Sequence, residues 1–316
     1  MSSFHHVSVL LDASIDALNI RPDGIYVDGT LGGGGHSREI ASRLTTGHLI
    51  GIDRDETALA AAGERLAPFM DRVTLVHSNF CEMDSVIRSL GYPGVDGVLL
   101  DLGVSSPQLD ESSRGFSYMA DAPLDMRMDR GDTLTAYQVV NEWSYEELKR
   151  ILFDYGAERY APLIAGAICR RREQKPISTT LELVDIIRGS VPPAALREKQ
   201  HPAKRSFQAI RIAVNDELGA VSKAMEAAIP MLNPGGHLAV ITFHSLEDRI
   251  VKSAMAEAAR GCTCPPEFPV CVCGKKPQIR LVTRKPVVSG PEELAENPRA
   301  RSAKLRVAEK CETFDL

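Results

Sequence analysis

Short hydrophobic segments alternate with amphipathic stretches along the first third of the chain. Four of these segments are apolar and short enough to be buried β-strands, at residues 25–28, 48–53, 72–76 and 95–100. Helical patterns separate them, most clearly at residues 36–44 and 55–66. Strand, helix and strand in this order predict β-α-β units, which build a parallel sheet with helices on its faces.

The alternation stops after residue 105. Residues 106–205 contain no convincing strand pattern and instead show two helix-start signals. Ser144 is followed three positions later by Glu147, and Thr179 by Glu182, which is the spacing of a capping box. The stretch therefore predicts a mostly helical insertion.

The α/β pattern returns after the insertion. Residues 206–232 carry one apolar stripe at helical spacing, residues 237–243 predict a fifth strand, and residues 278–283 and 302–308 predict two closing strands. We therefore expect an α/β protein in which a discontinuous domain, residues 1–105 and 206–316, holds a mostly parallel sheet. The helical domain, residues 106–205, is inserted into it and is expected to recognise the substrate.

Composition narrows the class of protein. Of 316 residues, 44% are hydrophobic and 25% are charged, which excludes wholesale disorder. No apolar run reaches the length of a membrane-spanning helix, and the first residues lack a basic segment followed by an apolar one, so we expect a cytoplasmic protein with no membrane partner. Seven cysteines, an odd number, argue against a disulfide framework.

Charge is unevenly distributed around the net value of −5. Residues 275–310 hold ten Lys or Arg against four Asp or Glu, and residues 197–211 hold five basic residues against Glu198 alone. Such patches favour a polyanionic partner, although a solvated basic face has the same composition.

A glycine-rich turn directly follows the first predicted strand. The run from Asp28 to His36 includes four consecutive glycines, and Asp53 ends the second strand, where folds of this kind bind a ribose. Glycines and an acid fit either a dinucleotide or S-adenosylmethionine. The turn does not match G-x-G-x-x-G, which disfavours a nicotinamide oxidoreductase, and it lacks the Gly-Lys-Ser/Thr ending of a P-loop. Asp28 is placed to accept from a cofactor amine, which S-adenosylmethionine has.

Six motifs together resemble the bacterial 16S ribosomal RNA cytosine-N4 methyltransferases, and the resemblance extends over residues 5–310. The motifs are DGTLGGGGH at 28–36, DLGVSSPQLD at 101–110, RGFS at 114–117, PLDMRM at 123–128, FHSLEDR at 243–249 and NPRARS at 297–302. The resemblance implies a Rossmann-like class I methyltransferase domain with a helical insert and S-adenosylmethionine as methyl donor. It also implies a decoding-centre cytidine of 16S ribosomal RNA, in the small ribosomal subunit, as the target, and it is consistent with a homodimer.

The resemblance further implies which residues form the site. The cofactor contacts carried over by position are Gly34, Gly35, His36, Asp53, Phe80, Asp101 and Gln108. Phe80 follows the third strand, where an aromatic ring can cover the adenine, but a core phenylalanine is an equally good interpretation. Asp101 is also a catalytic candidate, because an acceptor that grips the amine hydrogens localises the nitrogen lone pair.

The catalytic motif does not match the Asp/Asn/Ser-Pro-Pro-aromatic sequence common in amino-directed methyltransferases. Here Asp101 begins a different run, so the acceptor is either Asp101 or a backbone carbonyl at residues 104–106. His244, after the fifth strand, is the second catalytic candidate, placed to orient the base or relay a proton; the alternative is a residue that only supports its neighbours. Arg249 could hold a phosphate; the alternative is that Glu247, Asp248 and Arg249 form a salt-bridged helix start.

Two further features stand near the end of the chain. Arg299, Arg301, Lys304 and Arg306 form a basic run that we expect to present one phosphate-binding face, so phosphate contact is the favoured interpretation. Four cysteines within 12 residues form two Cys-x-Cys pairs, at Cys262, Cys264, Cys271 and Cys273. Zinc binding, reduced surface thiols and a labile disulfide all remain open for them, because Cys-x-Cys is tighter than the usual zinc knuckle, and no metal site is assigned.

A non-catalytic RNA-binding or assembly protein is the main alternative to an enzyme. The intact glycine turn and the acids Asp28, Asp53 and Asp101 weigh against it, since a protein without activity does not need its cofactor loop.

Overall fold

The computed structural model describes residues 8–105, 108, 111–265, 268–270 and 272–312. The chain divides into two compact units, Met1–Gly103 with Leu218–Leu316 and, inserted between these segments of sequence, Val104–Glu217. The second unit therefore extends past the predicted boundary at residue 205 to include one more helix. None of the helices described is long and apolar enough to cross a membrane.

The first unit is an α/β unit built on a seven-stranded sheet. Its strands are β1 (Ile25–Asp28), β2 (His48–Asp53), β3 (Val73–His77), β4 (Val95–Asp101), β5 (Leu232–Thr242), β6 (Ile279–Leu281) and β7 (Lys304–Lys310). The strand order is β3-β2-β1-β4-β5-β7-β6. The first five of these strands are parallel, and β7 runs antiparallel to both β5 and β6. This mostly parallel, Rossmann-like arrangement confirms the predicted fold class.

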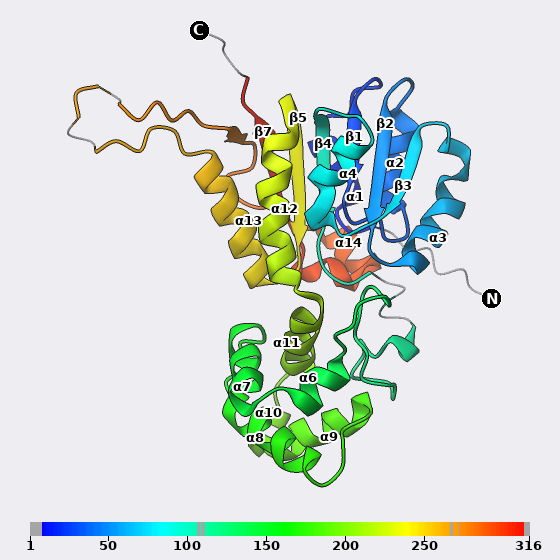
Figure 1. Ribbon diagram of the computed structural model, residues 1–316, viewed down its shortest axis with the longest axis vertical. Helices are drawn as coiled ribbons and strands as arrows, with labels where there is room; N and C mark the ends of the chain where they lie inside the picture. Colours follow the sequence, from blue (N-terminus) through cyan, green and yellow to red (C-terminus); the bar gives the residue numbers. More distant parts are fainter. Residues whose placement is uncertain (1–7, 106–107, 109–110, 266–267, 271, 313–316) are drawn as a thin grey trace. The chain divides into compact units, whose positions relative to one another are not determined.

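Helices cover both faces of this sheet (Figure 1). They are α1 (Leu11–Ala17), α2 (Gly35–Arg43), α3 (Glu56–Leu66), α4 (Met83–Ser89), α12 (Glu217–Met231), α13 (Ser245–Ala258) and α14 (Pro291–Glu296), with 3₁₀ turns η1 (Ala67–Phe69), η2 (Phe80–Glu82) and η4 (Pro298–Ser302). Buried residues of α4, α12 and α13 pack with one face of the strands, and those of α1, α2 and α3 pack with the other. The strands are therefore buried on both sides, which explains why they read as continuous apolar runs rather than alternating ones.

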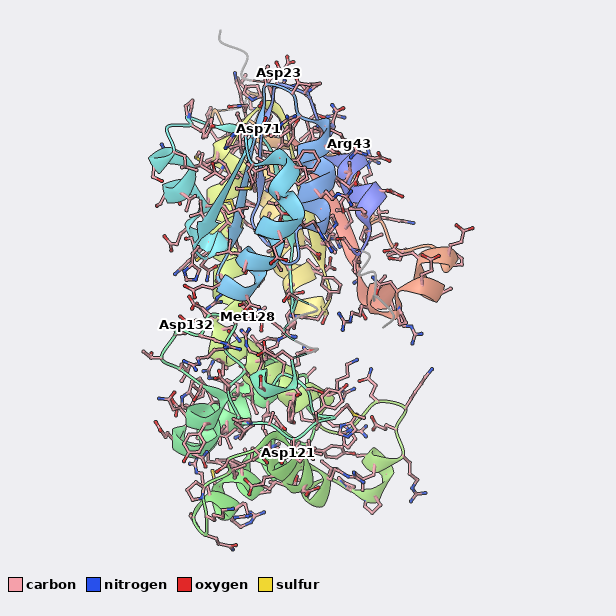
Figure 2. All side chains as sticks on the ribbon, turned by 90° about the vertical axis from the view of Figure 1, so that its right-hand side faces the viewer. Asp23, Arg43, Asp71, Asp121, Met128 and Asp132 are labelled. Carbon is pink, nitrogen blue, oxygen red and sulfur yellow. The ribbon has the colours of Figure 1, made fainter. Side chains whose placement is uncertain are left out.

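The parallel strands start at one edge of the sheet and end at the opposite edge. Asp23 and Asp71, which precede β1 and β3, both lie at the top of this unit in Figure 2, with Arg43 near them. The strand starts thus share one edge, and the ends of β1, β2 and β4 share the opposite one. Each of those three strands ends in an aspartate, so the parallel topology gathers Asp28, Asp53 and Asp101 at a single edge.

The second unit is helical among its described residues. It comprises η3 (Ser112–Arg114), α6 (Ala136–Glu142), α7 (Tyr145–Asp154), α8 (Ala161–Arg172), α9 (Thr180–Ser190), α10 (Pro193–Leu196) and α11 (Lys204–Asn215) around its own apolar core. Both predicted capping boxes are present, at the starts of α7 and α9, and α6 begins with a third. The role of this unit in substrate recognition stays a prediction.

One predicted helix was wrong. The apolar stripe over residues 206–232 predicts a single helix, but the structure has α11 and α12, separated at Asp216, which adopts a left-handed conformation with φ of 45°. A short polar side chain tolerates this conformation better than other non-glycine residues. Arg211 also bonds to Glu217 across the break, at 2.7 and 2.8 Å. The same stripe therefore spans a helix break that periodicity does not reveal.

Candidate cofactor and catalytic site

The loop between β1 and α2 brings backbone, rather than side chains, to the acidic edge of the sheet. Gly34 precedes α2 with φ of 72°, a conformation that side chains rarely adopt. A Cβ atom at Gly34 would lie 3.2 Å from Cβ of Ala62, so the loop also packs closely on α3. Gly35 begins α2, and His36 follows it. The predicted glycine contacts therefore belong to a tight turn, in which the N–H groups of Gly32 and Gly34 donate to Asp53 and to the carbonyl oxygen of Leu31.

The side chain of Asp28 is hydrogen-bonded to this loop and to the first turn of α2. The hydroxyl of Ser37 donates to its Oδ2 at 2.6 Å, and the N–H of Thr30 donates to its Oδ1 at 3.2 Å. Only 2% of the residue is exposed, and burial raises the pKa of its carboxyl to about 6. The expectation that Asp28 contacts a cofactor amine is therefore not supported, because the side chain lies beneath the loop and organises it.

Asp53 ends β2 with its carboxylate directed at the same loop. The N–H of Gly32 donates to Oδ2 at 2.8 Å, and the N–H of Asp55 donates to Oδ1 at 2.9 Å. Each oxygen has a second lone pair, so the carboxylate retains acceptor capacity for a diol. Burial raises its pKa to about 6, and the backbone donors oppose that shift. The contact of Asp53 with a ribose stays a prediction.

Asp101 ends β4 and is joined to the loop through the backbone. Its N–H donates to Oγ1 of Thr30 at 2.6 Å. Its side chain is 24% exposed, but Oδ1 is enclosed and has no hydrogen-bond partner among the described residues. Burial, followed by the nearby charges of Asp28 and Glu247, raises the pKa of Asp101 to about 8. A buried acceptor without a partner is costly and points to a ligand group that completes it.

His36 is buried beside Asp101 and is uncharged near neutral pH. Its Nε2 lies 3.1 Å from the carbonyl oxygen of Val9, and its Nδ1 lies 3.8 Å from Oδ2 of Asp101. Burial lowers the pKa of the imidazole to about 4. Because the carbonyl can only accept, we assign the proton to Nε2, which leaves the Nδ1 lone pair towards Asp101. His36 thus supplies no positive charge that would offset Asp101.

Phe80 lies at the same edge as the glycine loop. It begins η2, is half-buried and packs against the core of the sheet. A Cβ atom built on Gly29 would lie 3.2 Å from Cβ of Phe80, so Phe80 lies next to the residue that follows β1. Both interpretations of Phe80 fit this position, and its contact with adenine stays a prediction.

His244 caps α13, and its neighbour Glu247 completes the cap. The N–H of Glu247 donates to Nδ1 of His244 at 3.5 Å, and Oε2 of Glu247 accepts from the N–H groups of Phe243 and His244 at 3.0 and 3.3 Å. Glu247 is buried, and Oε1 lies 2.9 Å from Nε2 of His244. These contacts account for His244 as a helix cap, and its role as a proton relay stays a prediction.

Gln108 belongs to the second unit. It is buried there, and its Oε1 accepts from the N–H of Ser105 at 3.0 Å. Its predicted contact with the cofactor stays a prediction. Of the alternative carbonyl acceptors at residues 104–106, the one at residue 106 lies outside the described residues.

The basic run near the end of the chain does not form one phosphate-binding face, so that expectation was wrong. Lys304 and Arg306 lie in β7 and pair with Asp248 at 3.4 and 2.7 Å. Arg299 and Arg301 lie in η4 instead of a strand, and both are exposed. Asp248 thus forms ion pairs with two basic residues of β7. The other two basic residues, in η4, have exposed side chains.

Sequence reasoning missed Thr30, Ser37 and Glu247 as parts of this site. Thr30 joins the loop to Asp101, Ser37 satisfies Asp28, and Glu247 raises the pKa of Asp101. All three stand inside or next to recognised motifs. No sequence signal distinguishes them, because their roles depend on strands that are distant along the chain.

The raised pKa of Asp101 predicts an unusual pH dependence of stability. In the unfolded chain the pKa of Asp101 is about 3.9, and in the folded protein it is about 8. Between these two pH values the folded state binds more protons than the unfolded state, so the free energy of unfolding falls as the pH rises. The side chain in Asp101→Asn cannot ionise. At about pH 8 we therefore expect the variant to be more stable than the wild type by more than about 1.4 kcal/mol, the equivalent of one pKa unit. At about pH 4 we expect no such gain. Urea denaturation followed by circular dichroism at both pH values measures the difference.

The matched control is Asp71→Asn. Asp71 is exposed and its pKa is lowered by Arg72, so this substitution should produce no gain at high pH. Equal stabilisation by Asp101→Asn at the two pH values would contradict the burial of Asp101 as the cause.

Comparison with known proteins agrees with this geometry. The model of the MraW methylase family matches residues 3–311. A ribosomal RNA small subunit methyltransferase H from Brevibacillus brevis is 60% identical over 309 residues, covering 98% of this chain and 98% of the relative. The proteins of the same name from Heliobacterium modesticaldum and Symbiobacterium thermophilum are 59% and 58% identical, covering 97% and 98% of this chain and 99% and 98% of theirs. The chain therefore belongs to the MraW methylase family.

Proposed function

We propose that this protein is a methyltransferase that uses S-adenosylmethionine to methylate the N4 amine of a cytidine in small-subunit ribosomal RNA. Family membership and relatives at 58% to 60% identity, all named ribosomal RNA small subunit methyltransferase H, support the reaction class and the RNA. The cytidine, its N4 position and the decoding centre follow from the motifs that resemble the cytosine-N4 enzymes. The observation that carries the proposal is the enclosed, unpartnered oxygen of Asp101 beside a glycine turn.

The residues at the edge of the sheet fit S-adenosylmethionine. Asp53 would accept from the ribose hydroxyls, the turn at Gly34 and Gly35 would lie against the ligand, and Phe80 would pack on the adenine. Asp101 presents an acidic group to a ligand with a positive charge and an amine. When bound, the cofactor supplies an electrophilic methyl group on a sulfonium.

Asp101 would act on the accepting amine. The lone pair of a cytosine N4 amine is delocalised into the ring, so an oxygen that accepts an amine hydrogen localises that pair and stabilises the positive charge that develops. The ionised form is the stronger acceptor, and a cationic ligand nearby favours it. Asp101 holds this position because Thr30 fixes the backbone at the end of β4.

The target base must leave its stack to reach such a pocket. We therefore assign RNA positioning to two other parts of the protein, the helical unit and the exposed arginines of η4, Arg299 and Arg301. A ribosomal RNA substrate implies that the protein acts in the cytoplasm. A homodimer, consistent with the family resemblance, is part of the same proposal.

Methyl transfer tests the proposal directly. Purified protein is incubated with tritiated methyl donor and either free ribosomal RNA or isolated small subunits, and the label is mapped to a nucleotide. We expect label on the N4 amine of a single cytidine, and about a 10²- to 10⁴-fold loss in Asp101→Asn, the range for one positioned catalytic group. In the wild type, kcat/KM should rise with pH through about 8, the pKa of Asp101 in the free protein, and this dependence should vanish in Asp101→Asn.

Cofactor affinity separates catalysis from binding in this experiment. If Asp101→Asn and Asp101→Ala keep near-native turnover with unchanged cofactor affinity, Asp101 is not the acceptor. RNA binding without any transfer by the wild type would instead support a non-catalytic RNA-binding protein.

The exposed arginines of η4 generate a separate prediction for RNA affinity. Removing Arg299 and Arg301 together should weaken binding and reduce the slope of log affinity against log salt by about 0.7 to 0.9 for each phosphate that is no longer neutralised. Fluorescence anisotropy with a labelled RNA over a salt series measures the slope. Arg43→Ala, at the opposite edge of the sheet, is the control and should leave the slope unchanged (Figure 2). An unaltered slope in the double variant would rule out phosphate binding by η4.

A further inference from the structure

A loop between α13 and β6 brings cysteines together away from the proposed methyl-transfer site. This segment, residues 261–277, is called the thiol loop here, and its described residues extend away from the sheet in Figure 1, where they are orange. The N–H of Gln278 donates to the carbonyl oxygen of Ala258 at 2.8 Å, and Lys275 pairs with Glu257 of α13 at 2.5 Å. The C-terminal end of the loop is therefore attached to α13, from which the N-terminal end continues along the chain.

Three thiols converge in the thiol loop at metal-ligand spacing. The Sγ atoms of Cys262, Cys264 and Cys273 all lie within 4.8 Å of one another. Those of Cys262 and Cys273 are 3.7 Å apart. Zinc–sulfur bonds of about 2.3 Å in a tetrahedron place neighbouring sulfurs about 3.8 Å apart, whereas a disulfide requires about 2.05 Å. The measured separation matches two ligands of one zinc ion.

Backbone donors surround the same sulfur atoms. The N–H of Thr263 donates to Sγ of Cys273 at 3.4 Å, that of Cys264 to Sγ of Cys262 at 3.4 Å, and that of Val272 to Sγ of Cys264 at 3.3 Å. Each of the three sulfurs thus accepts a hydrogen bond from the main chain. Such donors stabilise the thiolate over the thiol, and they orient it as partners outside the coordination shell orient metal ligands.

The thiol loop has no hydrophobic core to order it among its described residues. Its larger apolar side chains are turned to solvent, with exposed fractions of 51% for Phe268, 70% for Val270 and 73% for Val272. A segment that buries so little apolar surface cannot offset the entropy of ordering its backbone. Metal coordination provides that free energy in small motifs that lack a core.

We propose that Cys262, Cys264 and Cys273 bind a structural Zn²⁺ ion as thiolates. Each thiol releases its proton as the metal–sulfur bond forms, so the ion replaces up to three protons on the described ligands. A tetrahedral site needs a fourth ligand. Cys271 is near in sequence but lies outside the described residues, and the inference rests on the other three. This site is independent of the proposed methyl transfer.

Metal analysis of the full chain tests the inference. Protein purified under reducing conditions without chelator or added zinc is analysed by inductively coupled plasma mass spectrometry. We expect about one zinc ion per chain in the wild type and in Cys311→Ser, a thiol outside the cluster, and loss of bound zinc in Cys262→Ser, Cys264→Ser and Cys273→Ser. Cobalt added to the metal-free protein should give the thiolate charge-transfer and tetrahedral d–d absorption bands, and the cysteine variants should lack them.

Limited proteolysis provides a readout of the structural role. Removal of the metal, or substitution of any of the three cysteines, should speed cleavage within residues 261–277 while the circular dichroism spectrum of the whole chain stays unchanged. A wild type that contains no metal and does not take up cobalt, or cysteine variants that keep a full equivalent of zinc, would overturn the inference. A disulfide found by thiol titration of metal-free protein handled without oxygen would overturn it as well.

Discussion

The buried carboxylate of Asp28 is the constraint on which the proposed site depends. It satisfies Ser37 at the start of α2 and the N–H of Thr30 within the loop, and Thr30 in turn accepts from the N–H of Asp101. Three hydrogen bonds therefore join the ends of β1 and β4 to the first turn of α2. A carboxyl buried in this way costs free energy, which its two hydrogen bonds partly offset. These bonds hold the glycine loop in place at the ends of β1 and β4.

The same arrangement gives the site its electrostatic character. Asp28, Asp53 and Asp101 end three neighbouring parallel strands, and burial raises the pKa of each. His36, next to Asp101, is neutral because burial lowers its own pKa. This edge of the sheet therefore holds three carboxyl groups that lose their protons at a higher pH than a solvent-exposed aspartate does. A positively charged ligand would stabilise the ionised forms of these acids. This electrostatic attraction would favour binding of a sulfonium cofactor at this edge.

Much of this structure could be predicted from local sequence. The strands up to Asp101, the glycine turn and both capping boxes follow from patterns a few residues long, and Asp53 from its place at the end of a strand. The break at Asp216 could not be predicted, because an apolar stripe continues through it. The pairing of Arg306 with Asp248, and the position of Glu247 near Asp101, depend on which strands become neighbours. Long-range pairing of this kind is absent from any short window of sequence.

Proton release on cofactor binding is the most direct test of the account. It reports whether a positively charged ligand causes Asp101, at the end of β4, to lose its proton. Isothermal titration calorimetry near neutral pH, in buffers of different ionisation enthalpy, compares S-adenosylmethionine with S-adenosylhomocysteine, which lacks the positive sulfur. With a pKa of about 8 in the free protein, Asp101 should release up to about one proton more for the sulfonium than for the thioether, and Asp101→Asn should abolish the difference. Equal proton release for the two ligands in the wild type would contradict the account.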